Sequence, residues 1–146
     1  MPYPPLVKYD TVDEYRQHYE RKYCRGAIST FDYISVRFRK NRFNHCFFES
    51  CKRNQQKDQF SRLRAERIDW IKAALQDPSA ELYVGWDKRK RAYDNSRRVA
   101  VAVNNYVVVI RLTGQQGAQF VTAYVADSPN TIKRIRNCLK WHQKKQ

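Results

Sequence analysis

The stretch from Arg97 to Asp127 contains three apolar segments rich in β-branched residues. Asn104-Asn105 separates the first two segments, and a loop with Gly114 and Gly117 separates the second from the third. Such segments with short Asn- and Gly-containing connections are typical of an antiparallel meander. Residues 81–86 form an earlier predicted strand, so the pattern predicts a four-stranded antiparallel sheet.

The two loops determine which side chains share a face of this sheet. A two-residue turn at Asn104-Asn105 places Arg98 opposite Arg111, and a loop over residues 114–117 places Arg111 opposite Phe120. The face expected to form the core carries Val99, Val101, Val103, Val108, Ile110, Leu112, Val121, Ala123 and Val125. The other face carries Arg98, Ala100, Ala102, Val107, Val109, Arg111, Phe120, Thr122 and Tyr124. Its small alanines lie among two arginines, a hydroxyl and a phenol, so we expect it to bind an anionic ligand.

Helix start and stop signals occur on both sides of the predicted strands. Thr11-Val-Asp-Glu14 is a capping box that opens a first helix. Residues 60–75 have the apolar spacing of a second helix, which Asp77-Pro78 stops. Ser128-Pro129 combines an N-cap residue with a proline suited to the first position of a last helix.

These elements predict an α+β fold in a single domain, residues 1–146. N-terminal helices, over about residues 1–78, are expected to pack on the C-terminal four-stranded antiparallel β-meander of about residues 81–127. A short C-terminal helix follows at about residues 129–141. Residues 27–50 mix helical spacing with a short extended segment and receive no assignment.

The charge balance indicates a polyanionic partner. The chain has 29 Lys and Arg residues against 14 Asp and Glu, a formal net charge of +15. Nucleic acid is favoured over a membrane because the basic residues are spread over the whole chain and no long apolar segment exists; acidic proteins are the alternative ligand. The first ten residues lack the apolar region of a signal peptide, so a cytoplasmic location is expected.

The four cysteines do not form a common metal-binding frame. Cys46 and Cys51 could join His45, and Cys138 could join His142, but no CxxC pair is present. Buried free thiols are the favoured interpretation, and no metal or other cofactor is predicted.

His45 is the histidine with the clearest chemical potential. It lies between a basic, aromatic segment and the apolar Cys46-Phe47-Phe48, where it could be fixed in the wall of a cleft. Its ordinary pKa near 6.5 would let it take a proton from a ribose 2′-hydroxyl or give one to a leaving oxygen. A core histidine bonded to backbone is the structural alternative, and position alone does not separate the two.

RNA cleavage without a metal needs a base, an acid and cations for the charge that grows on the phosphate oxygens. The catalytic candidates are His45, Arg98, Arg111, Thr122 and Tyr124. The substrate-binding candidates, chosen as cations or aromatic residues near them, are Arg37, Arg42, Arg64, Arg67, Lys88, Arg91, Tyr93 and Arg97. For the arginines near Phe38 and Phe43, a solvated basic helix face is the alternative.

Four segments spanning about residues 37–127 resemble the phage-associated branch of the nuclease fold shared by barnase, EndoU, colicin-type and RelE-like toxins. The matching segments are NRFNHCFF with His45, ERIDWIKAALQDP with Arg67 and Pro78, Arg91-Ala-Tyr93, and FVTAY with Thr122 and Tyr124. The resemblance implies metal-independent RNA cleavage with the His45, Thr122 and Tyr124 positions in the active site. It also implies an arginine or lysine there, for which Arg97, Arg98 and Arg111 compete.

The sequence therefore predicts an endoribonuclease that leaves a 2′,3′-cyclic phosphate. In this hypothesis His45 is the base or the acid, Arg98 and Arg111 bind the scissile phosphate, Thr122 positions it, and Tyr124 stacks on a base or donates a proton. The expected partners are RNA and, for a toxin, an acidic antitoxin or immunity protein. The alternatives are a non-catalytic nucleic-acid-binding module and a basic phage protein that inhibits a host factor.

Overall fold

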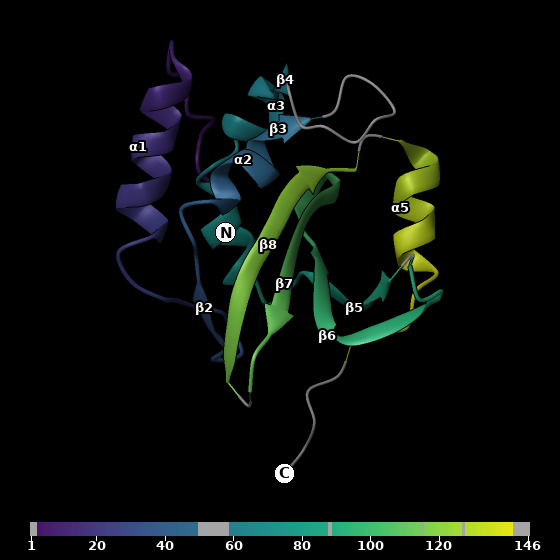
Figure 1. Cartoon of the computed structure of the whole chain (residues 1–146). Coiled ribbons are helices and arrows are strands. Elements are labelled where there is room, and N and C mark those ends of the chain that lie inside the picture. The colour runs from purple at the N-terminus through teal and green to yellow at the C-terminus, as the bar shows by residue number, and fades with distance from the viewer. Residues whose placement is uncertain (1–2, 50–58, 88, 115, 127, 142–146) are drawn as a thin grey trace.

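The computed structural model describes residues 3–49, 59–87, 89–114, 116–126 and 128–141. Lys88, Cys51 and His142 lie outside the described residues. The fold is mixed α+β (Figure 1). Its helices are α1 (Val12–Tyr23), α2 (Arg42–Phe47), α3 (Arg62–Ala65), α4 (Trp70–Leu75) and α5 (Pro129–Arg136), with a 3₁₀ turn at Val103–Asn105. The strands of the main sheet are β1 (Ile28–Ser29), β2 (Ser35–Arg37), β5 (Glu81–Asp87), β6 (Ala92–Val101), β7 (Tyr106–Leu112) and β8 (Gly117–Val125). A small second sheet pairs β3 (Phe48–Glu49) with β4 (Gln59–Phe60).

The main sheet is larger than the sequence predicted. In the described part of the chain it has six strands in the order β1-β2-β8-β7-β6-β5, and β2 runs parallel to β8. The strands from β5 to β8 are each antiparallel to the next. The two added strands lie within residues 27–50, where the sequence pattern gave no assignment.

Two predicted helices also have different bounds. The helix expected over residues 60–75 is divided into α3 and α4. The last helix ends at Arg136 rather than near residue 141, because the following residues pair with β5 instead. The amide of Val84 donates to the carbonyl of Leu139 at 2.7 Å, and the amide of Trp141 donates to that of Leu82 at 3.0 Å.

The predicted register between β6 and β7 is wrong by one residue. Arg97, not Arg98, lies opposite Arg111, and Arg98 lies opposite Ile110. The cause is the turn, where Asn104 and Asn105 both have positive φ and a third residue, Val103, joins the connection. A bulge at Val121 then sets Gln119, not the predicted Phe120, opposite Arg111. Val109 faces Thr122, the pairing that a loop over residues 114–117 gives.

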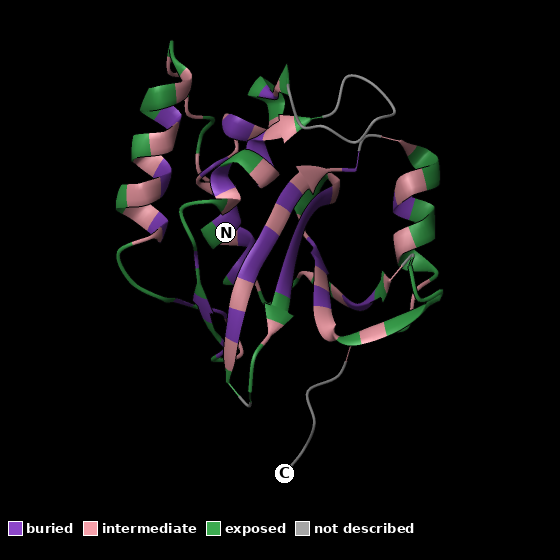
Figure 2. Ribbon diagram, in the orientation of Figure 1, coloured by how far each residue is buried: buried purple, intermediate pink, exposed green. Residues whose placement is uncertain are grey.

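Helices cover the two faces of the sheet unequally (Figures 1 and 2). Buried residues of α1, α2 and α4 pack on one face, which we call the core face; its central residues include Arg98, Ala100, Val108, Ile110, Phe120 and Ala123. On the other face only α5 packs among the described helices, so we call it the α5 face; it carries Arg97, Val99, Val101, Val107, Val109, Arg111, Gln119, Thr122 and Tyr124. The register shift has therefore moved Arg98 away from Thr122 and Tyr124.

Helix α1 anchors the core through three tyrosines. The capping box predicted at Thr11 and Glu14 is present, and Tyr15, Tyr19 and Tyr23 are fully buried along one stripe. Each phenol donates a hydrogen bond of 2.6–2.8 Å to a backbone carbonyl, those of Val7, Arg39 and Ile68 respectively. All three buried phenols therefore have a hydrogen-bond partner. A buried hydroxyl without a partner would cost about 1–3 kcal/mol.

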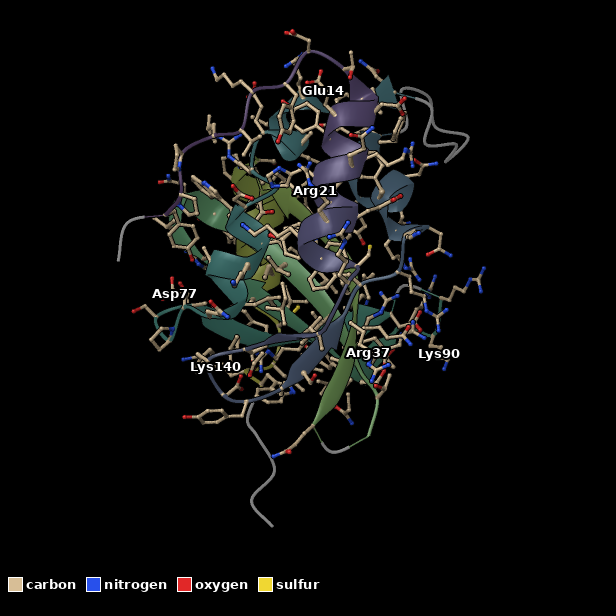
Figure 3. All side chains as sticks on the ribbon, turned by 90° about the vertical axis from the view of Figure 1, so that its left-hand side faces the viewer. Glu14, Arg21, Arg37, Asp77, Lys90 and Lys140 are labelled. Carbon is tan, nitrogen blue, oxygen red and sulfur yellow. The ribbon has the colours of Figure 1, made fainter. Side chains whose placement is uncertain are left out.

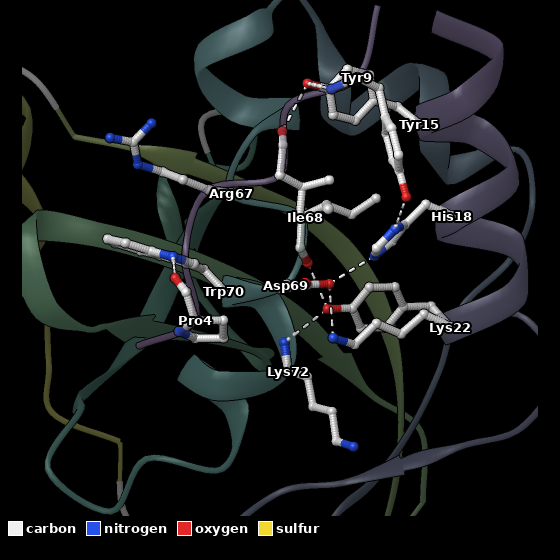
Figure 4. A network of polar contacts seen from close by, with 12 residues as sticks. Pro4, Tyr9, Tyr15, His18, Lys22, Arg67, Ile68, Asp69, Trp70 and Lys72 are labelled. Atoms are coloured by element: carbon white, nitrogen blue, oxygen red, sulfur yellow. Dashed lines mark hydrogen bonds and ion pairs between the residues drawn. The ribbon is translucent and has the colours of Figure 1, made fainter. Parts of the chain in front are cut away.

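A polar network at Asp69 joins α1 to the segment before α4 (Figure 4). His18 Nε2 and Lys22 Nζ lie 2.7 and 2.8 Å from Asp69 Oδ1, and the Asp69 side chain is 20% exposed. The hydrogen bond from His18, followed by the contacts with Lys22, lowers the pKa of Asp69 to about 2.

We expect this network to make stability sensitive to acid. Because the pKa of Asp69 is lower in the folded state than its ordinary value of 3.8, the unfolded chain binds more protons between these values. The contribution is present above about pH 4, is lost as the pH falls toward 2, and amounts to about 2 kcal/mol. Urea unfolding of Asp69→Asn at pH 7 should show this loss, with a smaller further decrease between pH 4 and pH 2 than in the wild type. The same change at the exposed Asp10 is the control, and an equal effect there would contradict the prediction.

Candidate nucleic-acid interface

A row of basic and polar side chains crosses four neighbouring strands on the α5 face. Cross-strand pairing aligns Arg37 of β2 with Gln119 of β8, Gln119 with Arg111 of β7, and Arg111 with Arg97 of β6. We call these four residues the arginine row. Adjacent strands lie about 4.8 Å apart, so the row presents three guanidinium groups across about 14 Å of sheet. Of its members, Arg37 and Arg111 are exposed.

The position of Arg97 depends on a glycine in the next strand. A Cβ atom on Gly85 would lie 2.6 Å from the Cβ of Arg97, so β5 and β6 can approach here only because residue 85 has no side chain. The Nε of Arg97 is buried and has no hydrogen-bond partner among the described residues; the nearest carboxylate oxygen, of Asp94, is 4.0 Å away. A buried donor without a partner is rare in proteins, so Arg97 retains a donor that no described residue uses.

The electrostatics around Asp94 show that these arginines act on the same region. Hydrogen bonds from Ser96 lower the pKa of Asp94 most, and the charges of Arg97 and Arg111 lower it further. Asp94 therefore stays ionised and offsets part of the positive charge, while Arg111 has no ion pair within the described residues.

The C-terminal half of β8 carries a second group of candidate functional side chains. Because β2 pairs only with residues 117–119, α2 and α3 can pack along the rest of β8. Cys46 Sγ donates to the carbonyl of Ala123 at 3.4 Å, which ties α2 to this strand. His45 precedes Cys46 at a half-buried position, as does Arg42 at the start of α2. The sequence-predicted histidine is therefore carried by a helix that is tied to β8 at Ala123, the residue before Tyr124.

Arg64 reaches from α3 to this part of β8. The hydroxyl of Ser61 caps α3 by accepting from the amide of Arg64. The guanidinium of Arg64 donates to the carbonyl of Cys46 at 3.1 Å, lies 3.4 Å from Glu49 Oε1, and is 5.7 Å from the centre of the Tyr124 ring. A cation is thus held beside Tyr124 by fixed partners, and Glu49 is a carboxylate that the sequence analysis did not identify.

Tyr124 keeps its proton at neutral pH. Its burial raises the pKa of the phenol above the usual value, and the charge of Arg64 offsets only part of this rise. Thr122 lies two residues earlier on the same face and is half-buried. The strand therefore presents a hydroxyl and a protonated phenol next to a guanidinium group.

Arg98 does not belong to this group, contrary to the expectation from the sequence. Its side chain is 1% exposed on the core face, where Nη1 donates to Asp32 Oδ2 at 2.7 Å. The guanidinium also lies 4.8 Å from the centre of the Trp141 ring and 5.8 Å from that of Phe31. Arg98 is fully engaged in the core, on the face opposite Thr122 and Tyr124.

The remaining binding candidates are dispersed. Arg67 donates to the carbonyl of Leu63 at 2.9 Å and lies over the Trp70 ring, so it contacts residues of α3 and α4 rather than the site.

Arg91 lies in the turn between β5 and β6 and has a positive φ of 48°. Tyr93 packs edge-on against Trp86 with ring centres 5.1 Å apart. Both rings are partly exposed, and Trp86, which adjoins the predicted basic loop, could have been selected with Tyr93 from the sequence.

Comparisons with protein families, curated proteins and solved structures found no match to this chain. Within the described residues no helix is long and apolar enough to cross a membrane. No group of three or more His, Cys, Asp or Glu side chains in that part of the chain could hold a metal ion. Among the described cysteines, Cys24 and Cys138 are free thiols.

Proposed function

We propose that this protein is an endoribonuclease that binds RNA on the α5 face and cleaves it without a metal ion. The observation that carries the proposal is that Arg97, Arg111, Thr122 and Tyr124 share one face of the sheet, with Arg64 beside Tyr124. Guanidinium groups bind phosphate, and a hydroxyl and a phenol supply hydrogen-bond donors. The excess of 15 positive charges supports a polyanionic substrate.

In the proposed reaction a ribose 2′-oxygen forms a bond to the adjacent phosphorus while the bond from phosphorus to the 5′-oxygen breaks. His45 takes the proton of the 2′-hydroxyl, and Tyr124, which is protonated at neutral pH, gives a proton to the leaving 5′-oxygen. Arg64 and Arg111 stabilise the negative charge on the non-bridging oxygens, and Thr122 donates a hydrogen bond to the same phosphate. The products are a 2′,3′-cyclic phosphate and a 5′-hydroxyl.

The fold is compatible with the sequence resemblance described above. N-terminal helices on a C-terminal antiparallel meander would suit the barnase-, EndoU- and RelE-like nucleases, and the order of β5 to β8 supports that assignment. An acidic antitoxin or immunity protein would then bind the α5 face and cover the arginine row.

A binding module without catalysis is the second candidate, and one observation favours it. Tyr124 packs against a cluster that includes Val107 and Ile132, so α5 covers part of the face on which the reaction would occur. A phosphodiester would then contact the arginine row without reaching the phenol.

Incubation of the purified protein with total RNA in EDTA tests the proposal. We expect RNA fragments with 2′,3′-cyclic phosphate ends, and we expect His45→Ala and Tyr124→Phe to lose them while retaining binding. Intact RNA with salt-sensitive binding would support the binding module. Cleavage that requires an added divalent metal would disprove the mechanism.

A further inference from the structure

A basic pocket lies at the end of the arginine row that is farthest from the β5–β6 turn. It has a volume of about 530 Å³ and lies between the C-terminal end of α1 and β2. Figure 3 labels Arg37, one of its lining residues. Its lining includes Arg25, Arg37, Phe38, Arg39 and Gln119. Arg37 and Gln119 are also members of the arginine row, so the pocket and the row form one continuous surface.

The three arginines of the pocket have no internal counter-charge. Arg25, Arg37 and Arg39 are all exposed, and none of them forms an ion pair or a side-chain hydrogen bond with another described residue. Three like charges lining one pocket repel one another unless an anion lies between them. The arrangement therefore favours an anionic ligand over a neutral or cationic one.

A buried phenylalanine lies between two of these arginines in the chain. Residues Arg37 and Arg39 flank Phe38, whose buried ring points into the core face and stacks on Phe120 with centres 4.8 Å apart. Packing of Phe38 on Phe120, and on Tyr23 at 4.6 Å, thus fixes the backbone between Arg37 and Arg39, and both arginines line the pocket.

The third arginine approaches from the loop after α1. Gly26 lies next to Arg25, and a Cβ atom added at Gly26 would meet no atom within 4 Å, so the entrance beside it is open. Arginine donates two parallel hydrogen bonds to phosphate, which makes it the side chain best suited to this ligand.

We propose that this pocket binds an internal phosphate of the RNA chain, distant from the bond that is cleaved. This inference rests on the proposed function for the identity of the ligand. Arg37 and Arg111 are separated by two strand spacings, about 10 Å, which is longer than one nucleotide unit. The RNA then runs across the strands, along the arginine row, and its length decides whether it reaches the pocket.

The affinity for uncleavable RNA measures the contribution of the pocket directly. The probes are 5′-labelled 2′-O-methyl RNAs of about 12 and about 3 nucleotides, which lack the attacking hydroxyl, titrated by fluorescence anisotropy at several salt concentrations. We expect the triple variant Arg25→Gln, Arg37→Gln, Arg39→Gln to bind the longer RNA at least about 10-fold more weakly and to reduce the salt slope by about 1–2. The shorter RNA, bound elsewhere on the row, should lose less than about 3-fold.

The matched control removes the same charge from exposed lysines outside the site, as Lys8→Gln, Lys72→Gln, Lys140→Gln. Equal weakening by the two triple variants, each shown to be folded by its thermal transition, would overturn the pocket assignment. Failure of the wild-type protein to bind either RNA at low salt would instead refute the proposed function. An effect of the pocket variant only on RNA with a 5′-terminal phosphate would overturn the internal position of the bound phosphate.

Discussion

Replacement of Arg64 by alanine is expected to slow RNA cleavage by roughly 10²–10³-fold, the usual cost of removing one donor that stabilises transition-state charge. Arg64 is the cation nearest to Tyr124 for which the structure gives a contact, at 5.7 Å from the ring. Its position is fixed by the carbonyl of Cys46 and the carboxylate of Glu49. Single-turnover cleavage of a defined RNA measures the effect.

Arg62 provides a matched control on the same short helix. It is exposed and donates to the carbonyl of Tyr9, away from β8, so Arg62→Ala should retain the wild-type cleavage rate. Arg64→Lys keeps the charge but loses the planar set of donors, and we expect an intermediate rate. If Arg64→Ala and Arg62→Ala cleave equally fast, Arg64 has no part in the reaction. If Arg64→Ala loses activity only in proportion to unfolding, its role is structural.

Elements with strong local signals could be predicted from the sequence. The capping box at Thr11 and Glu14 forms as expected, and Pro129 occupies the first turn of α5. The stripe of Tyr15, Tyr19 and Tyr23 is the buried side of α1. These features depend on residues within a few positions of one another, so tertiary structure does not need to be known.

The register of the sheet depended on details that the sequence does not contain. Both a two-residue and a three-residue connection are compatible with Asn104-Asn105, since asparagine adopts positive φ in either. The structure has the longer one, and the single-residue shift transfers Arg98 to the core face. The prediction for Thr122 and Tyr124 was insensitive to this error because they belong to β8, whose pairing with Val109 and Val107 was predicted correctly.

Long-range pairing explains why Arg37 was predicted only as a general binding residue. Strand β2 has three residues and pairs in parallel with β8, about eighty positions later in the chain. No local pattern in Ser35–Arg37 identifies that partner. The arginine row, and with it the proposed path of RNA across the sheet, therefore becomes visible only when the strands are assembled.

Replacement of Asp32 by alanine is expected to lower the free energy of unfolding by about 3–5 kcal/mol, because it leaves the guanidinium of Arg98 buried without its charged partner. Burial by itself would raise the pKa of Asp32, but hydrogen bonds from Arg98 and Thr30 outweigh it and hold the pKa below the ordinary value. Asp32 is therefore ionised at neutral pH. Urea unfolding at pH 7 measures the loss, and a decrease below about 1 kcal/mol would show that Trp141 and Phe31 are sufficient to hold Arg98.

The double variant Arg98→Met, Asp32→Asn separates the structural role of Arg98 from the catalytic role that the sequence suggested. It removes both charges together, so most of the stability lost in Asp32→Ala should return. Because Arg98 lies on the face opposite Thr122 and Tyr124, the double variant should also cleave RNA at close to the wild-type rate. A double variant that is stable and binds RNA but does not cleave it would place Arg98 in the reaction and contradict an active site on the α5 face. Retained cleavage would leave Arg64, Arg97 and Arg111 as the cations available to the phosphate.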